Sequence, residues 1–150
     1  MGKAQKQLTA EQLKVVEHKC AEHGARLTPA RLTAYTELMS CPTPISAYEL
    51  IARLEKLQDR KIAPLTVYRH LDFLMQVGLV HKLESKQSYI ACDHPQHKHE
   101  SQYLLCSSCG KADELDSDQL GKILNKLTNQ KGFKPVSSVV EVTGLCSDFR

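Results

Sequence analysis

The residues best able to do chemistry are cysteines, histidines and a glutamate in the second part of this 150-residue chain. Thiolates bind soft or borderline metal ions, and imidazole and carboxylate groups complete the ligand sets that zinc accepts. Four of the six cysteines lie between positions 92 and 146, and four histidines lie between positions 81 and 99. These residues are Cys92, Cys106, Cys109, Cys146, His81, His94, His97 and His99. The pattern predicts a metal-binding protein.

Cys106 to Gly110 form a C-x-x-C-G sequence between two expected strands, and Cys146 follows at the end of a third. A C-x-x-C turn delivers two thiolates from one short loop, so a structural zinc site is the favoured interpretation. A redox pair is the alternative, but that motif usually opens a helix, whereas residues 111–115 look extended. Simple packing of the thiols is the third possibility. A second C-x-x-C would require a cysteine at position 149, where the chain has Phe149. Either the fourth ligand comes from elsewhere, such as water or a neighbouring histidine, or the site binds zinc weakly in this chain.

A second candidate set consists of four residues with mixed donors: His81, Cys92, His99 and Glu114. One thiolate with imidazoles and a carboxylate suits zinc, because sulfur disfavours the hard cations that prefer oxygen. Each residue alone also has an ordinary explanation as a surface histidine, a buried thiol or a solvated glutamate. For His94 and His97 the ordinary surface explanation is favoured.

The first part of the chain predicts helices from their start signals. Helices are expected from Thr9 to about residue 23, from Thr28-Pro29 to about Ser40, from Ser46, and from Pro64-Thr66 to Gly78. Residues 46–49 read S-x-x-E, which is a capping box. Two short β-type runs follow, at residues 79–83 and 88–91. Helices followed by such a hairpin indicate a winged helix-turn-helix, whose recognition helix enters the major groove of DNA.

The second part of the chain predicts a small α/β domain. Strands are expected at residues 103–105 and 135–142, and a helix capped by Ser117 is expected to run to Gly132. About 50 residues is near the size at which a metal or a partner subunit is needed for stability. The predicted fold class is therefore α+β, with domains at residues 1–92 and 102–150 joined by a His-rich link at 93–101.

Composition narrows the class of protein further. The first 84 residues carry 12 basic and 9 acidic side chains, whereas the remainder carries 8 of each, so the basic excess lies where a polyanion would bind. No apolar run is long enough for a membrane span, and the N-terminus lacks the apolar core of a signal peptide. We therefore expect a cytoplasmic protein without a membrane partner. In a reducing compartment, Cys20 and Cys41 are interpreted as buried or incidental thiols.

Several short sequences resemble the ferric uptake regulator superfamily, and its zinc uptake regulator branch in particular. They are Arg26-Leu27-Thr28-Pro29 with Arg31, Ile45-Ser46-Ala47-Tyr48, Thr66-Val67-Tyr68-Arg69 with Leu71 and Phe73-Leu74, Gly78-Leu79-Val80-His81-Lys82, Cys106 to Gly110, and Gly144-Leu145-Cys146. Together they cover nearly the whole chain in the expected order. The branch assignment depends on the thiolate of Cys92 and on the absence of a compact H-H-D-H sequence in residues 94–99.

The resemblance implies an N-terminal winged-helix DNA-binding domain, a C-terminal dimerisation domain and repression switched on by metal. It implies structural Zn²⁺ at Cys106, Cys109 and Cys146, with Phe149 where the family usually has its fourth cysteine. It implies a regulatory Zn²⁺ at the mixed set, His81, Cys92, His99 and Glu114, and therefore two zinc ions per subunit. The implied recognition helix is residues 66–78, in which Tyr68 and Arg69 occupy the first turn with Thr66. The expected phosphate contacts are Arg26, Arg31, Ser46 and Tyr48.

The expected function is that of a zinc-responsive transcriptional repressor of zinc uptake genes. As a homodimer it would bind palindromic double-stranded operator DNA, with zinc locking the hinge between domains. An iron, manganese or peroxide sensor of the same superfamily is the alternative. A zinc-dependent hydrolase with Glu114 as general base is disfavoured, because no H-E-x-x-H or comparable catalytic sequence is present and the proposed site is closed by four protein ligands. We expect no small-molecule substrate. A zinc-stabilised interaction module without DNA binding is the remaining alternative.

Overall fold

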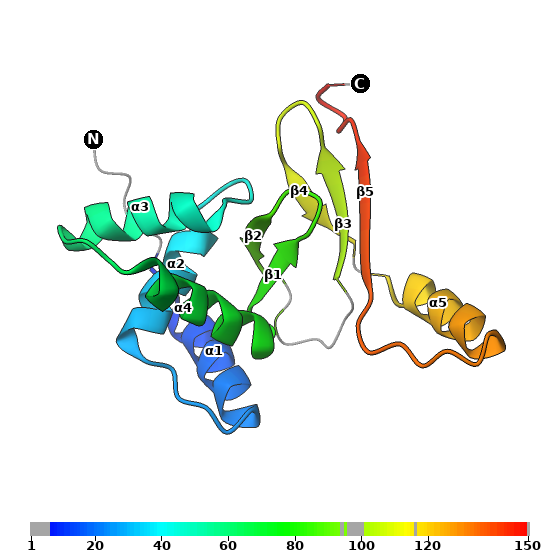
Figure 1. The fold of residues 1–150 in the computed structure, drawn as a ribbon, viewed down its shortest axis with the longest axis horizontal. Coiled ribbons are helices and arrows are strands. Elements are labelled where there is room, and N and C mark those ends of the chain that lie inside the picture. Colours follow the sequence, from blue (N-terminus) through cyan, green and yellow to red (C-terminus); the bar gives the residue numbers. More distant parts are fainter. Residues whose placement is uncertain (1–6, 94, 96–100, 116, 150) are drawn as a thin grey trace. The chain divides into compact units, whose positions relative to one another are not determined.

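The computed structural model describes residues 7–93, 95, 101–115 and 117–149 and divides the chain into two compact units, residues 1–96 and 97–150 (Figure 1). The first unit contains four helices and a hairpin. They are α1 (Ala10–Glu22), α2 (Pro29–Met39), α3 (Ala47–Gln58), α4 (Pro64–Gln76), β1 (Val80–Leu83) and β2 (Ser88–Ala91). This arrangement confirms the expected winged helix-turn-helix. Among the described residues, no helix is long and apolar enough to cross a membrane.

The helices of the first unit begin where local chemistry satisfies their free backbone N–H groups. The Thr9 and Ser46 side chains each accept a hydrogen bond from the backbone three residues on, and both complete a capping box. Thr28 caps α2, with Pro29 in the first turn, where its missing N–H costs nothing. Proline also opens α4, but Ala63 at its N-cap supplies no side-chain bond. Three of the four helix starts therefore follow from single residues.

One apolar core holds the first unit together. It is built from α1 to α4 and both hairpin strands, and its fully buried members include Val16, Leu50, Val67, Leu71, Leu74 and Leu79. β1 pairs antiparallel with β2, and an isolated bridge joins Ile45 to Tyr89, so the wing is hydrogen-bonded to the segment before α3. The hairpin is therefore attached to the helices by backbone hydrogen bonds as well as by the shared core.

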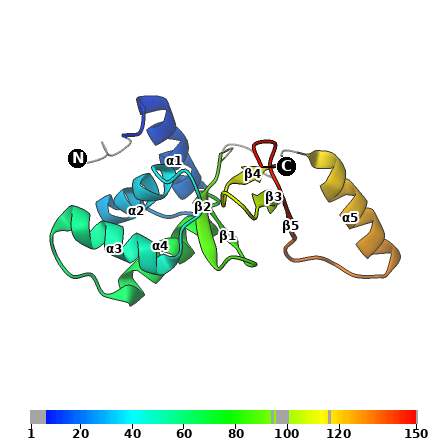
Figure 2. The ribbon, with the colours of Figure 1, turned by 90° about the horizontal axis from the view of Figure 1, so that it is seen from above.

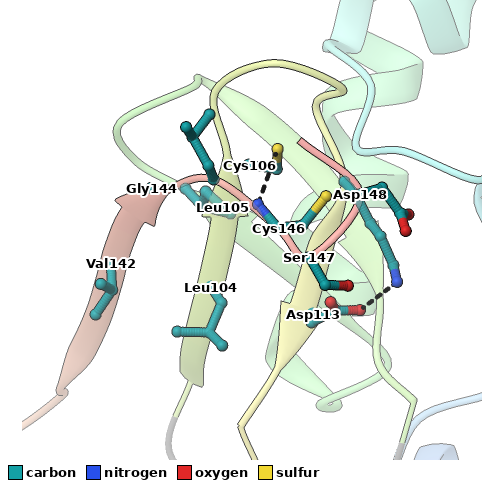
Figure 3. A pocket seen from close by; sticks show the side chains of 11 residues that line it. Leu104, Leu105, Cys106, Asp113, Val142, Gly144, Cys146, Ser147 and Asp148 are labelled. Carbon is teal, nitrogen blue, oxygen red and sulfur yellow. Dashed lines mark hydrogen bonds and ion pairs between the residues drawn. The ribbon is translucent and has the colours of Figure 1, made fainter. Parts of the chain in front are cut away.

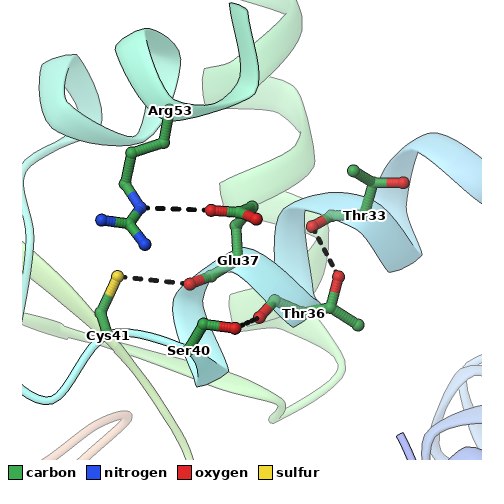
Figure 4. Close-up of polar contacts among 6 residues, drawn as sticks. All are labelled: Thr33, Thr36, Glu37, Ser40, Cys41 and Arg53. Carbon is green, nitrogen blue, oxygen red and sulfur yellow. Dashed lines mark hydrogen bonds and ion pairs between the residues drawn. The ribbon is translucent and has the colours of Figure 1, made fainter. Parts of the chain in front are cut away.

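An ion pair joins α2 to α3 at the edge of this core (Figure 4). The Arg53 Nε donates to Glu37 Oε2 across 3.2 Å, and the Glu37 side chain is only 10% exposed. The Cys41 thiol donates to the backbone carbonyl of Glu37 at 3.2 Å, which explains why this thiol is half-buried. A carboxylate this far from solvent needs a cationic partner to offset its lost hydration.

The second unit is a three-stranded sheet with one helix. Its elements are β3 (Ser101–Cys106), β4 (Ala112–Glu114), α5 (Asp118–Gln130) and β5 (Val139–Gly144). The strand order is β4-β3-β5, with β3 antiparallel to β4 and parallel to β5. The parallel pairing requires a crossover, and α5 lies within it. β5 is left at an edge of the sheet.

The helix of the second unit is not packed as an ordinary crossover helix. None of the α5 residues is buried, and Figures 1 and 2 both show α5 standing apart from the sheet of its own unit. Ile123 and Leu127 on α5 and Val139 and Val142 on β5 are each about half exposed. A helix with such a marked apolar face normally buries it.

Two local expectations for the second unit were wrong. Ser117 stands at the N-cap of α5, but its side chain makes no capping hydrogen bond. The last strand begins at Val139 and not at Pro135, and Val139 lies opposite Ser101 in the pairing with β3. β-branched composition therefore located the strand but not its start.

Replacing Arg53 with alanine should lower the free energy of unfolding by about 1–3 kcal/mol, because it leaves the Glu37 carboxylate without its cation. Urea unfolding followed by circular dichroism measures this change. Arg60→Ala is the matched control: Arg60 is exposed and bonds only the neighbouring Gln58 side chain, so its loss should change stability by less than about 0.5 kcal/mol. Equal effects of the two substitutions would contradict the role of the ion pair.

Candidate metal centre and nucleic-acid interface

Three thiols converge at one end of the β4-β3-β5 sheet. Cys106 ends β3, Cys109 lies in the turn to β4, and Cys146 follows β5. The three Sγ atoms all lie within 4.8 Å of one another, and the Sγ atoms of Cys109 and Cys146 are 3.8 Å apart. Two sulfur atoms bound to one tetrahedral zinc ion at about 2.3 Å are separated by about 3.8 Å. The three cysteines therefore fit zinc in spacing as well as in chemistry.

Backbone hydrogen bonds position these thiols. The Gly110 N–H donates to the Cys106 carbonyl at 3.0 Å and closes the C-x-x-C turn. Gly110 has a positive φ of 75°, a conformation that glycine adopts without strain. From the other side, the Ser107 N–H and hydroxyl both donate to the Gly144 carbonyl, which fastens the turn to the end of β5. Sequence patterns did not single out Ser107.

The electrostatics of the three thiols differ. Backbone N–H groups of Cys109 and Cys146 stabilise the thiolate of Cys106 and lower its pKa to about 6, with the Cys146 N–H 3.4 Å from the sulfur. The Asp148 backbone N–H also lowers the pKa of Cys146, but burial and the adjacent sulfurs outweigh it, so that pKa is raised. One thiol is thus ready to bind metal as a thiolate near neutral pH.

The C-x-x-C turn does not open a helix. β3 ends at Cys106, a turn covers residues 107–109, and β4 begins at Ala112. The expectation of an extended segment after the turn is confirmed. A redox pair of the thioredoxin kind uses the N-terminus of a helix to stabilise its thiolate, and this turn has none.

The mixed candidate set is spread over both units. In the first unit, His81 lies on β1 opposite Ile90, and Cys92 lies two residues beyond Ile90, where its N–H donates to the Leu79 carbonyl. His81 and Cys92 therefore share one face of the hairpin, and a ring nitrogen of His81 lies within 4.8 Å of the Cys92 Sγ. In the second unit, Glu114 ends β4 opposite Tyr103. His99, like His94 and His97, lies outside the described residues.

The residues expected to contact DNA lie on or near α4 and α3. On α4, Val67 and Leu71 point into the core, while Thr66, Tyr68 and Arg69 are exposed. Because α4 begins at Pro64, Tyr68 and Arg69 occupy its second turn and not its first. Tyr48, on the first turn of α3, is 74% exposed, the most exposed aromatic side chain of this unit.

Two of the expected phosphate contacts already have internal partners. The Arg31 guanidinium donates to the Arg26 carbonyl at 2.7 Å and lies 3.7 Å from the centre of the Phe73 ring. The Ser46 hydroxyl caps α3 by accepting from the Glu49 N–H. Arg26 itself is exposed. The structure thus shows that Arg31 helps to position α2 against α4 and that Ser46 begins α3. The sequence patterns had indicated the second role but not the first.

A winged-helix unit with an exposed fourth helix, joined to a small α/β unit that gathers three thiols at zinc spacing, defines a DNA-binding class of protein with a metal centre. The chain belongs to the ferric uptake regulator family, whose model matches residues 22–143. The resemblance inferred from the sequence motifs is confirmed.

Individual relatives narrow the comparison. The chain is 37% identical over 146 residues to the zinc uptake regulation protein of Escherichia coli (strain K12), covering 95% of this chain and 84% of that protein. It is 32% identical over 130 residues to the zinc uptake regulation protein of Mycobacterium tuberculosis (strain H37Rv), covering 85% and 96%. Among solved structures, a zinc uptake regulator complexed with zinc and DNA matches with a TM-score of 0.86 and 36% identity, over 95% of each chain.

Cys106→Ser should lose one zinc ion per chain and lower the melting temperature of the protein, since metal bound only to the folded state stabilises it. Zinc content by atomic emission and calorimetry measure both effects. Cys41→Ser is the matched control, because its hydroxyl can still donate to the Glu37 carbonyl and it lies far along the chain from the three thiols. Unchanged zinc content in Cys106→Ser would rule out this centre.

Proposed function

We propose that this protein is a zinc-responsive transcriptional repressor that binds palindromic operator DNA as a zinc-loaded homodimer and controls zinc uptake genes. The observation that carries the proposal is the likeness, at a TM-score of 0.86, to a zinc uptake regulator complexed with zinc and DNA. The relatives from Escherichia coli and Mycobacterium tuberculosis, both zinc uptake regulation proteins, support the same metal.

The DNA-binding surface in this proposal is the exposed side of α4. Arg69 can donate two parallel hydrogen bonds to guanine O6 and N7, a contact that discriminates bases by about 1–3 kcal/mol. Thr66 and Tyr68 are exposed as well, on either side of the buried Val67. Tyr48 and Arg26 would contact phosphates, and Ser46 would contribute through the α3 N-terminus that it caps, since helix N-termini attract anions. Arg31, held over Phe73, would reach phosphate only with its remaining N–H groups.

The regulatory zinc site in this proposal consists of His81, Cys92, His99 and Glu114. The pair on the hairpin supplies one imidazole and one thiol within 4.8 Å. A thiolate donor favours zinc over the harder manganese and ferrous ions, so it supports a zinc sensor over the other sensors of the family. Bound at this set, Zn²⁺ would act as a structural cross-link and not as a catalyst.

The mixed ligand set accounts for regulation. Its proposed members come from both units, so one ion bound to all four would restrict the movement of the units relative to each other. Two recognition helices in a dimer must match the spacing of two half-sites, and restricting that movement favours the matching arrangement. Linkage then requires operator DNA to tighten zinc binding by the same factor. Residues 1–92, 93–101 and 102–150 are the domains and hinge of this proposal.

The second unit is the proposed dimerisation domain. Its described residues carry exposed apolar side chains on α5 and β5, among them Ile123, Leu127, Val139 and Val142, and β5 is an edge strand. A sheet edge and an apolar helix face of this kind are normally covered by a partner. A twofold dimer would cover the same surfaces on both copies, which suits a palindromic DNA site.

Cys92→Ser should abolish the response of DNA binding to zinc. In the wild type, zinc should raise affinity for a duplex by about 5- to 150-fold, the usual range of allosteric coupling. The duplex is selected from a random pool by the zinc-loaded protein, and its affinity is measured by fluorescence anisotropy at fixed salt, with and without chelator. Cys20→Ser, which alters a thiol in the α1 core, is the control for general damage, because it should retain the response. A Cys92→Ser protein that responds fully would rule out the mixed site.

Ile123→Glu with Leu127→Glu should convert the dimer to a monomer, because two carboxylates would be buried in an apolar interface. Sedimentation velocity measures the mass. Lys122→Glu with Lys126→Glu is the control, since it places equal charge on the same helix at exposed polar positions and should leave the dimer intact. If both variants are monomers, the added negative charge and not the loss of the apolar face would be the cause of dissociation, and the proposed interface would be contradicted.

A further inference from the structure

The three-thiol centre has three donors where tetrahedral zinc takes four. Among the described residues, the cluster of histidine, cysteine and acidic donors at this place contains only Cys106, Cys109 and Cys146. The nearby Asp113 carboxylate is not a member of this cluster, and its Oδ1 lies 3.4 Å from the Lys111 Nζ in an ion pair. One corner of the tetrahedron is therefore not supplied by this part of the chain.

The backbone shows where a fourth donor would stand. Cys106 and Cys109 are three residues apart in a turn, and the turn after β5 repeats that spacing from Cys146 to position 149. The Phe149 N–H donates to the Cys146 carbonyl at 2.9 Å, so a hydrogen bond also closes the second turn, one residue earlier than the Gly110 N–H closes the first. Phe149 offers a phenyl ring that cannot bind zinc, and its side chain is 51% exposed. The chain therefore forms the second turn but has no zinc ligand at position 149.

A pocket of about 370 Å³ lies beside the sulfur atoms (Figure 3). Cys106 and Cys146 are part of its lining, with Leu104 and Val142 as apolar walls and Lys111 as a cation. Pockets that bind small molecules span about 300–1,000 Å³, so this one has room for a small molecule as well as for water. A small molecule in this pocket could supply the fourth zinc ligand with one atom, while its other atoms contact the apolar side chains of the lining.

We propose that zinc held by Cys106, Cys109 and Cys146 keeps an exchangeable fourth position that binds the thiolate of a small molecule from solution. This inference rests on the structural zinc of the proposed function. A thiolate suits the position because a fourth sulfur completes the four-sulfur set of ordinary structural zinc sites. The incoming thiol loses its proton to solvent as its sulfur takes the place of solvent at the ion, and no electron is transferred.

Cobalt(II) in place of zinc reports sulfur ligands through sulfur-to-metal charge-transfer absorption. The full-length Cys92→Ser protein is the background, because it removes the thiolate of the mixed site. Cobalt-loaded protein is titrated with 2-mercaptoethanol, and ethylene glycol serves as the oxygen analogue. The charge-transfer absorption should rise to saturation by about one third as a fourth sulfur joins three. Ethylene glycol should leave it unchanged.

Substitutions at position 149 provide the matched comparison. Phe149→Cys should show the higher absorption from the start and no response to thiol, whereas Phe149→Leu should respond as the background does. If 2-mercaptoethanol does not change the charge-transfer absorption of the cobalt-loaded Cys92→Ser protein, the proposal is overturned, because the fourth position on the metal is then not open to a thiol. A background without charge-transfer absorption would overturn both the proposal and the structural site, while zinc-dependent duplex binding by the wild type tests the regulatory function separately.

Discussion

The parallel pairing of β3 with β5 is the interaction on which the metal centre depends. Through it, Cys106 comes opposite Gly144, so Cys146 reaches the C-x-x-C turn from 37 residues beyond Cys109. The described buried side chains of the second unit all lie on β3, namely Gln102, Tyr103, Leu105 and Cys106. A core this small stabilises a domain poorly without help. In the proposed function, metal at one end of the sheet and a partner over α5 and β5 would supply what the core lacks, and folding, zinc binding and assembly would then be linked in this unit.

The first unit is built differently, and the difference suits its proposed task. Its helices and hairpin share one apolar core, so it can hold a recognition surface without metal. β1 follows α4 after three residues, and Leu79 is buried beside Leu74, whose carbonyl accepts its N–H. His81 therefore lies close along the chain to the helix that carries Arg69, and the Cys92 N–H donates to the carbonyl of Leu79, which lies between that helix and β1. A metal that restrains the hairpin would restrain that helix as well.

Phe149 separates this chain from the complete four-cysteine pattern while the surrounding framework is retained. Ser107 still fastens the turn to β5, and the Cys146 N–H still donates to the Cys106 sulfur. Such a framework keeps three thiolates in place whichever donor fills the fourth corner. The structural centre would then sense what surrounds it in solution, in addition to its support of the fold.

The sequence alone determined what depends on neighbouring residues. The capping residues Thr9, Thr28 and Ser46 located helix starts, the change to a two-residue period located the wing, and the C-x-x-C spacing identified the turn. Only the tertiary structure decided what depends on distant partners: that Arg31 lies over Phe73, that β5 begins at Val139, and that Cys146 meets Cys106 and Cys109. Local hydrogen bonds are encoded within a few residues, whereas strand register and side-chain convergence are set by packing between segments that the sequence pattern does not order in space.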